Sequence, residues 1–124
     1  RIYYFGWRHD VPDFVWQNLK QGVEVWGIGT KNHGTSNGIF YKYRHRNNYY
    51  SLRITPREDF YIVNSLLKEE WQGNYVDLLS LTIDSKKSVS VFTPNHKYIT
   101  YDGRHLTPSG ARFYACKLSE SLWQ

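Results

Sequence analysis

A β-prone stretch, Val23-Glu24-Val25-Trp26-Gly27-Ile28, decides the fold class, because it directly follows a predicted helix. A second run of this kind, Ile2-Tyr3-Tyr4-Phe5, precedes the same helix. Asp10 is the predicted N-cap of that helix and Gly22 the residue that ends it, around apolar residues at helical spacing: Val11, Phe14, Val15 and Leu19. The order strand, helix, strand is typical of parallel strands joined by a right-handed crossover.

The chain then enters a loop rich in Gly, Asn, Thr and Ser at residues 29–37. Residues 39–54 mix aromatic and basic side chains without a clean period of 2 or 3.6, which predicts an irregular excursion or a hairpin. Thr55 and Glu58 form a capping box with Pro56 at the first helical position, so we expect an amphipathic helix that includes Trp71 and stops near Gly73.

A third strand is predicted at residues 75–79, and a small hairpin is predicted at residues 89–99, with Pro94-Asn95 as its turn. A last helix begins at Thr107-Pro108, and on it we expect Cys116 to be a buried structural thiol. The order of elements predicts an α/β fold with a mostly parallel sheet, formed by a single domain over residues 1–124.

Composition limits the class of protein without identifying it. The chain has 124 residues, 40% of them hydrophobic and 22% charged, which is ordinary for one globular domain. Its apolar runs are far shorter than the roughly 20 residues of a membrane-spanning helix. The formal charge of +5 favours anionic partners, and the 11 Tyr and 5 Trp supply stacking surfaces for sugars or bases. The five His and one Cys lack the spacing of metal ligands, so no metal site is predicted.

The segment most indicative of chemistry is Tyr101-Asp102-Gly103-Arg104-His105-Leu106-Thr107-Pro108-Ser109-Gly110-Ala111. It places a carboxylate and an imidazole three residues apart, in a turn fixed to the start of a helix. In nucleophilic catalysis one imidazole nitrogen must reach a hydroxyl while an oxygen holds the other. The alternative is a tight turn at Asp102-Gly103 followed by an exposed His105.

The extended pattern Asp102-x-x-His105-Leu106-Thr107-x-x-Gly110-Ala111 resembles the C-terminal signature of the SGNH/GDSL hydrolases, especially their sugar O-acyltransferase branch. The resemblance implies a flavodoxin-like three-layer sandwich. It also implies that His105 is the general base, that Asp102 orients it, and that both serve a serine nucleophile.

The chain departs from this family because it contains no Gly-Asp-Ser motif, which the family carries after its first strand. Ile2–Phe5 corresponds best to the family's middle strand. We therefore expect the N-terminal strand or strands to be missing, and the chain to be the C-terminal part of a larger polypeptide. Gly6 and Arg8 stand where the family places an oxyanion hole and are the candidates for that role.

One serine inside the chain is an alternative nucleophile. Ser36 lies in Gly34-Thr35-Ser36-Asn37-Gly38, which matches the Gly-x-Ser-x-Gly elbow. The elbow requires a strand directly before it and a helix directly after it. Residues 29–33 intervene after the predicted strand, so a flexible glycine-rich loop is favoured.

Cations and aromatics alternate in Tyr41-Lys42-Tyr43-Arg44-His45-Arg46, which suits an acidic glycan or single-stranded nucleic acid. The alternative is a solvated surface hairpin or a contact with a part of the protein outside this sequence. The candidate substrate-binding residues are Trp7, Asn32, His33, Arg44 and Arg46.

The sequence and the resemblance together predict a serine-dependent ester hydrolase or O-acyltransferase that acts on a carbohydrate or cell-surface polysaccharide. No bound cofactor is expected, although a transferase would use an acyl donor such as acetyl-CoA. Nucleic acid is not the expected partner. The resemblance suits a protein of the bacterial envelope or cytoplasm. The second hypothesis is a non-catalytic carbohydrate- or nucleic-acid-binding α/β module without the nucleophile.

Overall fold

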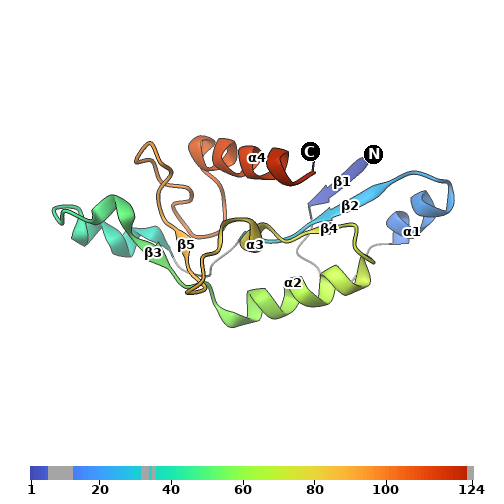
Figure 1. Cartoon of the computed structure of the whole chain (residues 1–124), viewed down its shortest axis with the longest axis horizontal. Helices are drawn as coiled ribbons and strands as arrows, with labels where there is room; N and C mark the ends of the chain where they lie inside the picture. Colours follow the sequence, from blue (N-terminus) through green and yellow to red (C-terminus); the bar gives the residue numbers. More distant parts are fainter. Residues whose placement is uncertain (6–12, 32–33, 35, 123–124) are drawn as a thin grey trace. The chain divides into compact units, whose positions relative to one another are not determined.

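The computed structural model describes residues 1–5, 13–31, 34 and 36–122 (Figure 1). Two compact units are present: unit 1 comprises Arg1–Lys31 and Glu58–Leu79, and unit 2 comprises Asn32–Arg57 and Ser80–Gln124. Helices and short strands occur in both, so the predicted mixed α/β class is confirmed. That residues 1–124 form one domain within a larger one stays a prediction.

Unit 1 is built on a parallel sheet of three strands in the order β1-β2-β4 (Figure 1). β1 (Ile2–Phe5) pairs with β2 (Val25–Ile28) over its whole length, and β2 pairs with β4 (Tyr75–Val76). The parallel pairing of the first two strands through a crossover helix was predicted from the sequence and is confirmed.

Two helices pack on the face of this sheet that carries Val25 and Gly27. Figure 1 shows α2 (Glu58–Glu70) running along the strands, and α1 (Asp13–Lys20) connects β1 to β2. One buried cluster unites both helices with the sheet: Val15, Val25, Leu67, Trp71 and Tyr75. Gly27 allows this packing, because a Cβ atom built there would lie 2.6 Å from Cε2 of Trp71.

Both helices of unit 1 end as the sequence indicates. Gly22 takes a left-handed conformation with φ of 79°, and the N–H of Val23 donates to the carbonyl of Asn18 at 3.0 Å, which closes the last turn of α1. Gln72 and Gly73, with φ of 53° and 93°, end α2 in the same way. The predicted cap of α1, Asp10, lies outside the described residues.

Two predicted boundaries are wrong. α2 begins at Glu58 and not at Pro56, so the Thr55–Glu58 capping box does not start it. The predicted strand 75–79 stops at Val76, and residues Leu78–Thr82 form a short helix, α3. Asp77 explains the change, because its Oδ1 accepts a hydrogen bond from the N–H of Leu79 at 3.0 Å and so caps the new helix.

Unit 2 contains the irregular part of the chain. Residues 37–51 form two 3₁₀ helices, η1 (Asn37–Tyr43) and η2 (Tyr49–Ser51), in place of a hairpin. β3 (Arg53–Ile54) then pairs antiparallel with β5 (Val89–Ser90). The guanidinium of Arg53 joins the strands, since it donates to Oγ of Ser88 and Oγ of Ser90, each at 2.8 Å.

The hairpin predicted at residues 89–99 is present, and its turn is at Pro94-Asn95. Phe92 and Tyr98 form an antiparallel bridge, and the N–H of Thr93 donates to the carbonyl of Lys97 at 2.8 Å. His96 takes a left-handed conformation with φ of 62°, which a non-glycine residue rarely adopts. The chain ends in α4 (Pro108–Leu122), which begins where the sequence predicts.

Two further findings concern the helices. Cys116 is exposed on α4, so the prediction of a buried thiol is wrong. Within the ranges that the structure describes, no helix combines the length and the apolar character needed to cross a bilayer.

The contact between Gly27 and Trp71 makes a testable prediction. Gly27→Ala should lower the free energy of unfolding by about 1–3 kcal/mol, because the new methyl group overlaps a buried indole. Urea unfolding followed by circular dichroism measures the change. Gly38→Ala is the matched control, since its Cβ would lie 3.6 Å from Oγ of Ser36, an ordinary contact. Equal stability of the two variants would contradict the prediction.

Candidate active site and an aromatic pocket

The turn between residue 100 and α4 holds the predicted Asp102–His105 pair. Oδ2 of Asp102 lies 2.6 Å from Nδ1 of His105, which is a short, charge-assisted contact. The turn thus brings together the two side chains that the sequence pairs, and their catalytic roles stay predictions.

The carboxylate of Asp102 is held by further donors. Its Oδ1 accepts hydrogen bonds from the backbone N–H of His105 at 2.7 Å, from that of Arg104 at 2.8 Å, and from Oγ1 of Thr100 at 3.1 Å. The His105 side chain, followed by these backbone donors, holds the pKa of Asp102 well below its usual range. Asp102 is therefore an ionised hydrogen-bond acceptor at neutral pH.

The imidazole of His105 is open to solvent. Its side chain is 76% exposed, against 53% for that of Asp102. Because Nδ1 faces the carboxylate, a neutral ring keeps its proton there and has its lone pair on Nε2. Nε2 has no hydrogen-bond partner among the residues that the structure describes. This arrangement suits an imidazole that accepts a proton from an incoming hydroxyl group.

The turn is anchored by the start of α4. The N–H of Thr107 donates to the carbonyl of Ile99 at 2.9 Å, and Thr100 and Leu106 form an antiparallel bridge. Oγ1 of Thr107 donates to the carbonyl of Tyr98 at 2.5 Å and accepts the N–H of Gly110 at 2.9 Å, as an N-cap. Both ends of the turn are thus fixed.

Two glycines make this local fold possible. Gly103 has a φ of 78°, in the left-handed region where other side chains are strained. A Cβ atom at Gly110 would lie 2.0 Å from the carbonyl oxygen of Ile99. The Gly in the Asp-x-x-His-Leu-Thr-x-x-Gly pattern therefore has a packing role beside the Asp102–His105 turn.

The alternative nucleophile, Ser36, lies close to this turn in the chain's fold but makes other contacts. Its hydroxyl donates to the carbonyl of Tyr101 at 3.2 Å and accepts the N–H of Gly38 at 3.4 Å as the N-cap of η1. It makes no hydrogen bond to His105. Residue 36 is followed by a 3₁₀ helix rather than the α-helix of a nucleophile elbow.

Unit 2 also contains a pocket of about 410 Å³, which lies within the range of small-molecule sites. Half of its lining residues are aromatic: Tyr41, Tyr49, Tyr50, Phe92, Tyr98 and Tyr101. Three others are basic: Arg44, His96 and Lys97. The rest lie at the start of α4: Thr107, Pro108 and Ser109.

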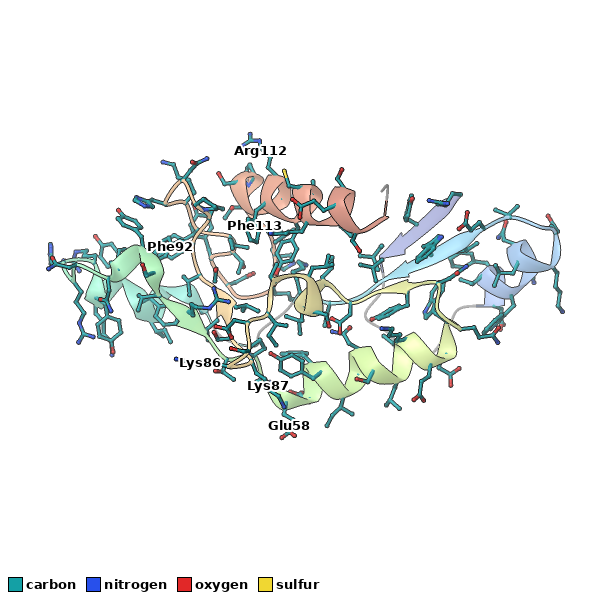
Figure 2. The ribbon with its side chains drawn as sticks, viewed as in Figure 1. Glu58, Lys86, Lys87, Phe92, Arg112 and Phe113 are labelled. Carbon is teal, nitrogen blue, oxygen red and sulfur yellow. The ribbon has the colours of Figure 1, made fainter. Side chains whose placement is uncertain are left out.

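The aromatic side chains of the pocket support one another. Phe92, labelled in Figure 2, packs edge-on against Tyr49 at 4.9 Å between ring centroids and stacks on Tyr98 at 4.6 Å. The hydroxyls of Tyr49 and Tyr98 are 2.6 Å apart. Desolvation, with this hydrogen bond, raises the pKa of Tyr98 to about 12. The phenol of Tyr98 is therefore neutral at neutral pH.

The basic residues at 42–46 separate into two groups. Arg44 lies over the ring of Tyr41, 4.3 Å from its centroid, and lines the pocket. Arg46 lies over the ring of Tyr43 at 4.2 Å, does not line the pocket, and shares that ring with Lys42. Of the two candidate substrate-binding arginines, the structure thus places only Arg44 at the cavity.

Several predicted site residues lie outside the described residues: Gly6, Trp7, Arg8, Asn32 and His33. Their oxyanion and substrate-binding roles stay predictions. The described part of the chain contains no group of three or more His, Cys, Asp or Glu side chains that could hold a metal ion.

The sequence did not indicate the pocket. Its members come from residues 41–50, 92–101 and 107–109, which are far apart in the chain. The signals that were present are the unusual density of tyrosine and the hairpin turn that carries His96 and Lys97. Neither signal shows which aromatic side chains meet.

Comparison with protein-family models, with curated proteins and with solved structures gave no match. The resemblance to the SGNH/GDSL hydrolases therefore rests on the residues of the turn and of the start of α4.

The hydrogen bonds of Asp102 predict a pH-dependent contribution to stability. Because folding lowers its pKa, the stabilising effect is present above the unfolded value of about 3.9 and is lost as the pH falls toward the folded value. Asp102→Asn should therefore be less stable than the wild type at pH 7, and the difference should shrink below about pH 4.

Urea unfolding at a series of pH values measures this difference. Glu69→Gln, which changes an exposed carboxylate away from the N-terminus of α2, is the control and should not lose stability at pH 7. A difference that stays constant down to pH 2.5 would mean that the ionised carboxylate does not stabilise the turn.

Proposed function

We propose that this chain supplies the general base and its orienting carboxylate to a serine-dependent acyl-ester hydrolase or O-acyltransferase acting on a carbohydrate. The observation that carries the proposal is the 2.6 Å contact between Oδ2 of Asp102 and Nδ1 of His105, with the opposite edge of the imidazole exposed. Fixing Nδ1 in this way presents Nε2 as the proton acceptor.

In the proposed reaction Nε2 of His105 accepts the hydroxyl proton of a serine that lies outside residues 1–124. The serine oxygen attacks the ester carbonyl, and Asp102 stabilises the imidazolium that forms. The imidazolium then gives its proton to the leaving alcohol or thiol as the acyl-serine forms. Water or a sugar hydroxyl, deprotonated by the same imidazole, next attacks the acyl-serine and regenerates the serine.

Hydrolysis and transfer use the same residues of this chain and differ in the acceptor. In a transferase, an acyl donor such as acetyl-CoA would acylate the serine. Oxyanion stabilisation by Gly6 and Arg8 remains part of the proposal. The three parallel strands β1-β2-β4 are consistent with a flavodoxin-like sandwich, to which sequence outside these residues would add the strand that bears the serine.

A second candidate function is a non-catalytic binding module for a carbohydrate or nucleic acid. The observation in its favour is the pocket of unit 2, because binding there by stacking and charge requires no nucleophile. Labelling with a serine-reactive probe distinguishes the two functions.

The experiment uses the natural gene product that contains these residues, treated with a fluorophosphonate serine probe and assayed for p-nitrophenyl acetate hydrolysis. We expect labelling of one serine outside residues 1–124. His105→Ala should abolish labelling and lower kcat/KM roughly 10³-fold, and Asp102→Asn should lower kcat/KM by roughly 10²-fold or more.

The control variant is His45→Ala, which removes an exposed imidazole between η1 and η2 and should leave labelling and kcat/KM unchanged. Absence of both labelling and hydrolysis in the wild type would overturn the enzyme proposal and favour the binding module. Labelling at Ser36 would assign the chain to a different class of hydrolase.

A further inference from the structure

We propose that the aromatic pocket of unit 2 binds an anionic sugar unit, a pyranose that carries a carboxylate or a phosphate group. The proposal rests on three observations: the size and aromatic wall of the pocket, the basic side chains at it, and the charge of the unit that contains it.

The wall of the pocket offers aromatic surface that the protein leaves uncovered. Tyr101, Tyr41 and Tyr50 are 68%, 60% and 49% exposed, whereas tyrosine is on average intermediate in burial. Two of these rings pack on other aromatic side chains of the pocket, because Tyr50 lies edge-on against Phe92 and Tyr101 against Tyr98. Exposed rings suit stacking against the apolar face of a sugar ring, and phenol hydroxyls can bond to its hydroxyl groups.

Two cations are available to an anionic group at this pocket. Arg44 has five N–H donors, and the described residues use one of them, on the carbonyl of Tyr41 at 3.2 Å. The ammonium group of Lys97 has no hydrogen-bond or ion-pair partner within the described ranges. None of the twelve described residues that line the pocket is acidic. A carboxylate or phosphate therefore meets positive charge without competition from the wall.

His96 also lines the pocket and packs against one of its tyrosines. Its ring stacks on Tyr50 with 4.1 Å between centroids and an angle of 6° between planes, while its backbone is left-handed. The turn places His96 and the adjacent Lys97 together at the wall.

Unit 2 as a whole carries a net positive formal charge. Its sequence contains 11 Lys and Arg against 3 Asp and Glu, a formal charge of +8, whereas unit 1 contains 5 against 8, a formal charge of −3. The net charge of +5 thus arises in the unit that contains the pocket. Such a field attracts anionic ligands and speeds their association.

The pocket favours a sugar over single-stranded nucleic acid. Nucleic-acid sites extend over several nucleotides along a basic groove with successive stacking rings. Here the cavity is about 410 Å³. That volume suits one or two sugar rings rather than a run of bases.

The pocket and the Asp102–His105 turn are adjacent in the chain, since Tyr101 and Thr107 line the pocket and flank the turn. The role of the pocket in holding the sugar during acyl transfer rests on the proposed function. Sugar binding at the pocket is independent of that function, because it needs neither His105 nor a serine nucleophile.

Isothermal titration calorimetry on the full chain tests the proposal with four probes: trigalacturonic acid, a neutral galactose trisaccharide, glucose 6-phosphate and the oligonucleotide dT10. We expect binding of the trisaccharide acid or the sugar phosphate at least tenfold tighter than that of the neutral sugar. The stronger of these two acids identifies the anionic group. Arg44→Gln and Lys97→Gln should each weaken that binding roughly tenfold.

Arg46→Gln is the matched control, because it removes the same charge two residues away without touching the pocket, and its affinity should stay within about twofold of the wild type. Equal loss in Arg46→Gln and Arg44→Gln would overturn the pocket in favour of a diffuse basic surface. Tighter binding of dT10 than of either acidic sugar, or no preference for the acids over the neutral sugar, would also overturn it.

Sugar affinity and serine labelling test the pocket and the acyl chemistry independently. His105→Ala should keep the sugar affinity while losing serine labelling. Sugar binding without any labelling of the natural gene product would retain the pocket and reject the acyl chemistry. Labelling without preferential binding of an acidic sugar would retain the acyl chemistry and reject the pocket.

Discussion

The carbonyl oxygen of Ile99 accepts the N–H of Thr107, and Gly110 packs so closely beside it that no side chain fits between. This contact fixes the first turn of α4 against the end of the hairpin. The residues between, 100–106, must then close a short loop, which Gly103 makes possible by its positive φ. Oδ1 of Asp102 accepts hydrogen bonds from three donors within that loop, and so the Asp102–His105 pair depends on the contact at Ile99.

The parts of the fold that follow from local chemistry were predictable from the sequence. The β1-α1-β2 order follows from alternating β-prone and amphipathic stretches that Gly22 separates, and α4 begins at Thr107-Pro108 as the cap and proline indicate. The errors have local causes as well. Asp77 caps a helix that the apolar run Leu78-Leu79 had suggested as strand, and Thr55 is not followed by helical residues until Glu58.

The site was predictable only in part, for a physical reason. Asp102 and His105 are neighbours in one turn, so spacing alone brings them together. Tyr49, Phe92 and Tyr98 meet across more than forty residues of chain, and residues 37–51 form 3₁₀ helices with no hydrophobic period to mark them. The separation of Arg44 from Arg46 likewise depends on which tyrosine ring each cation covers.

Each unit of this chain is interrupted by the other, which has a consequence for synthesis on the ribosome. The sheet of unit 1 is incomplete until β4 has emerged, and by then residues 32–57 have already left the exit tunnel. That segment contains five Lys and Arg and no Asp or Glu, and its partners Phe92 and Tyr98 are still inside the exit tunnel. The nascent chain therefore displays a basic, tyrosine-rich stretch before the pocket exists, at a stage when anionic surfaces such as ribosomal RNA compete for it.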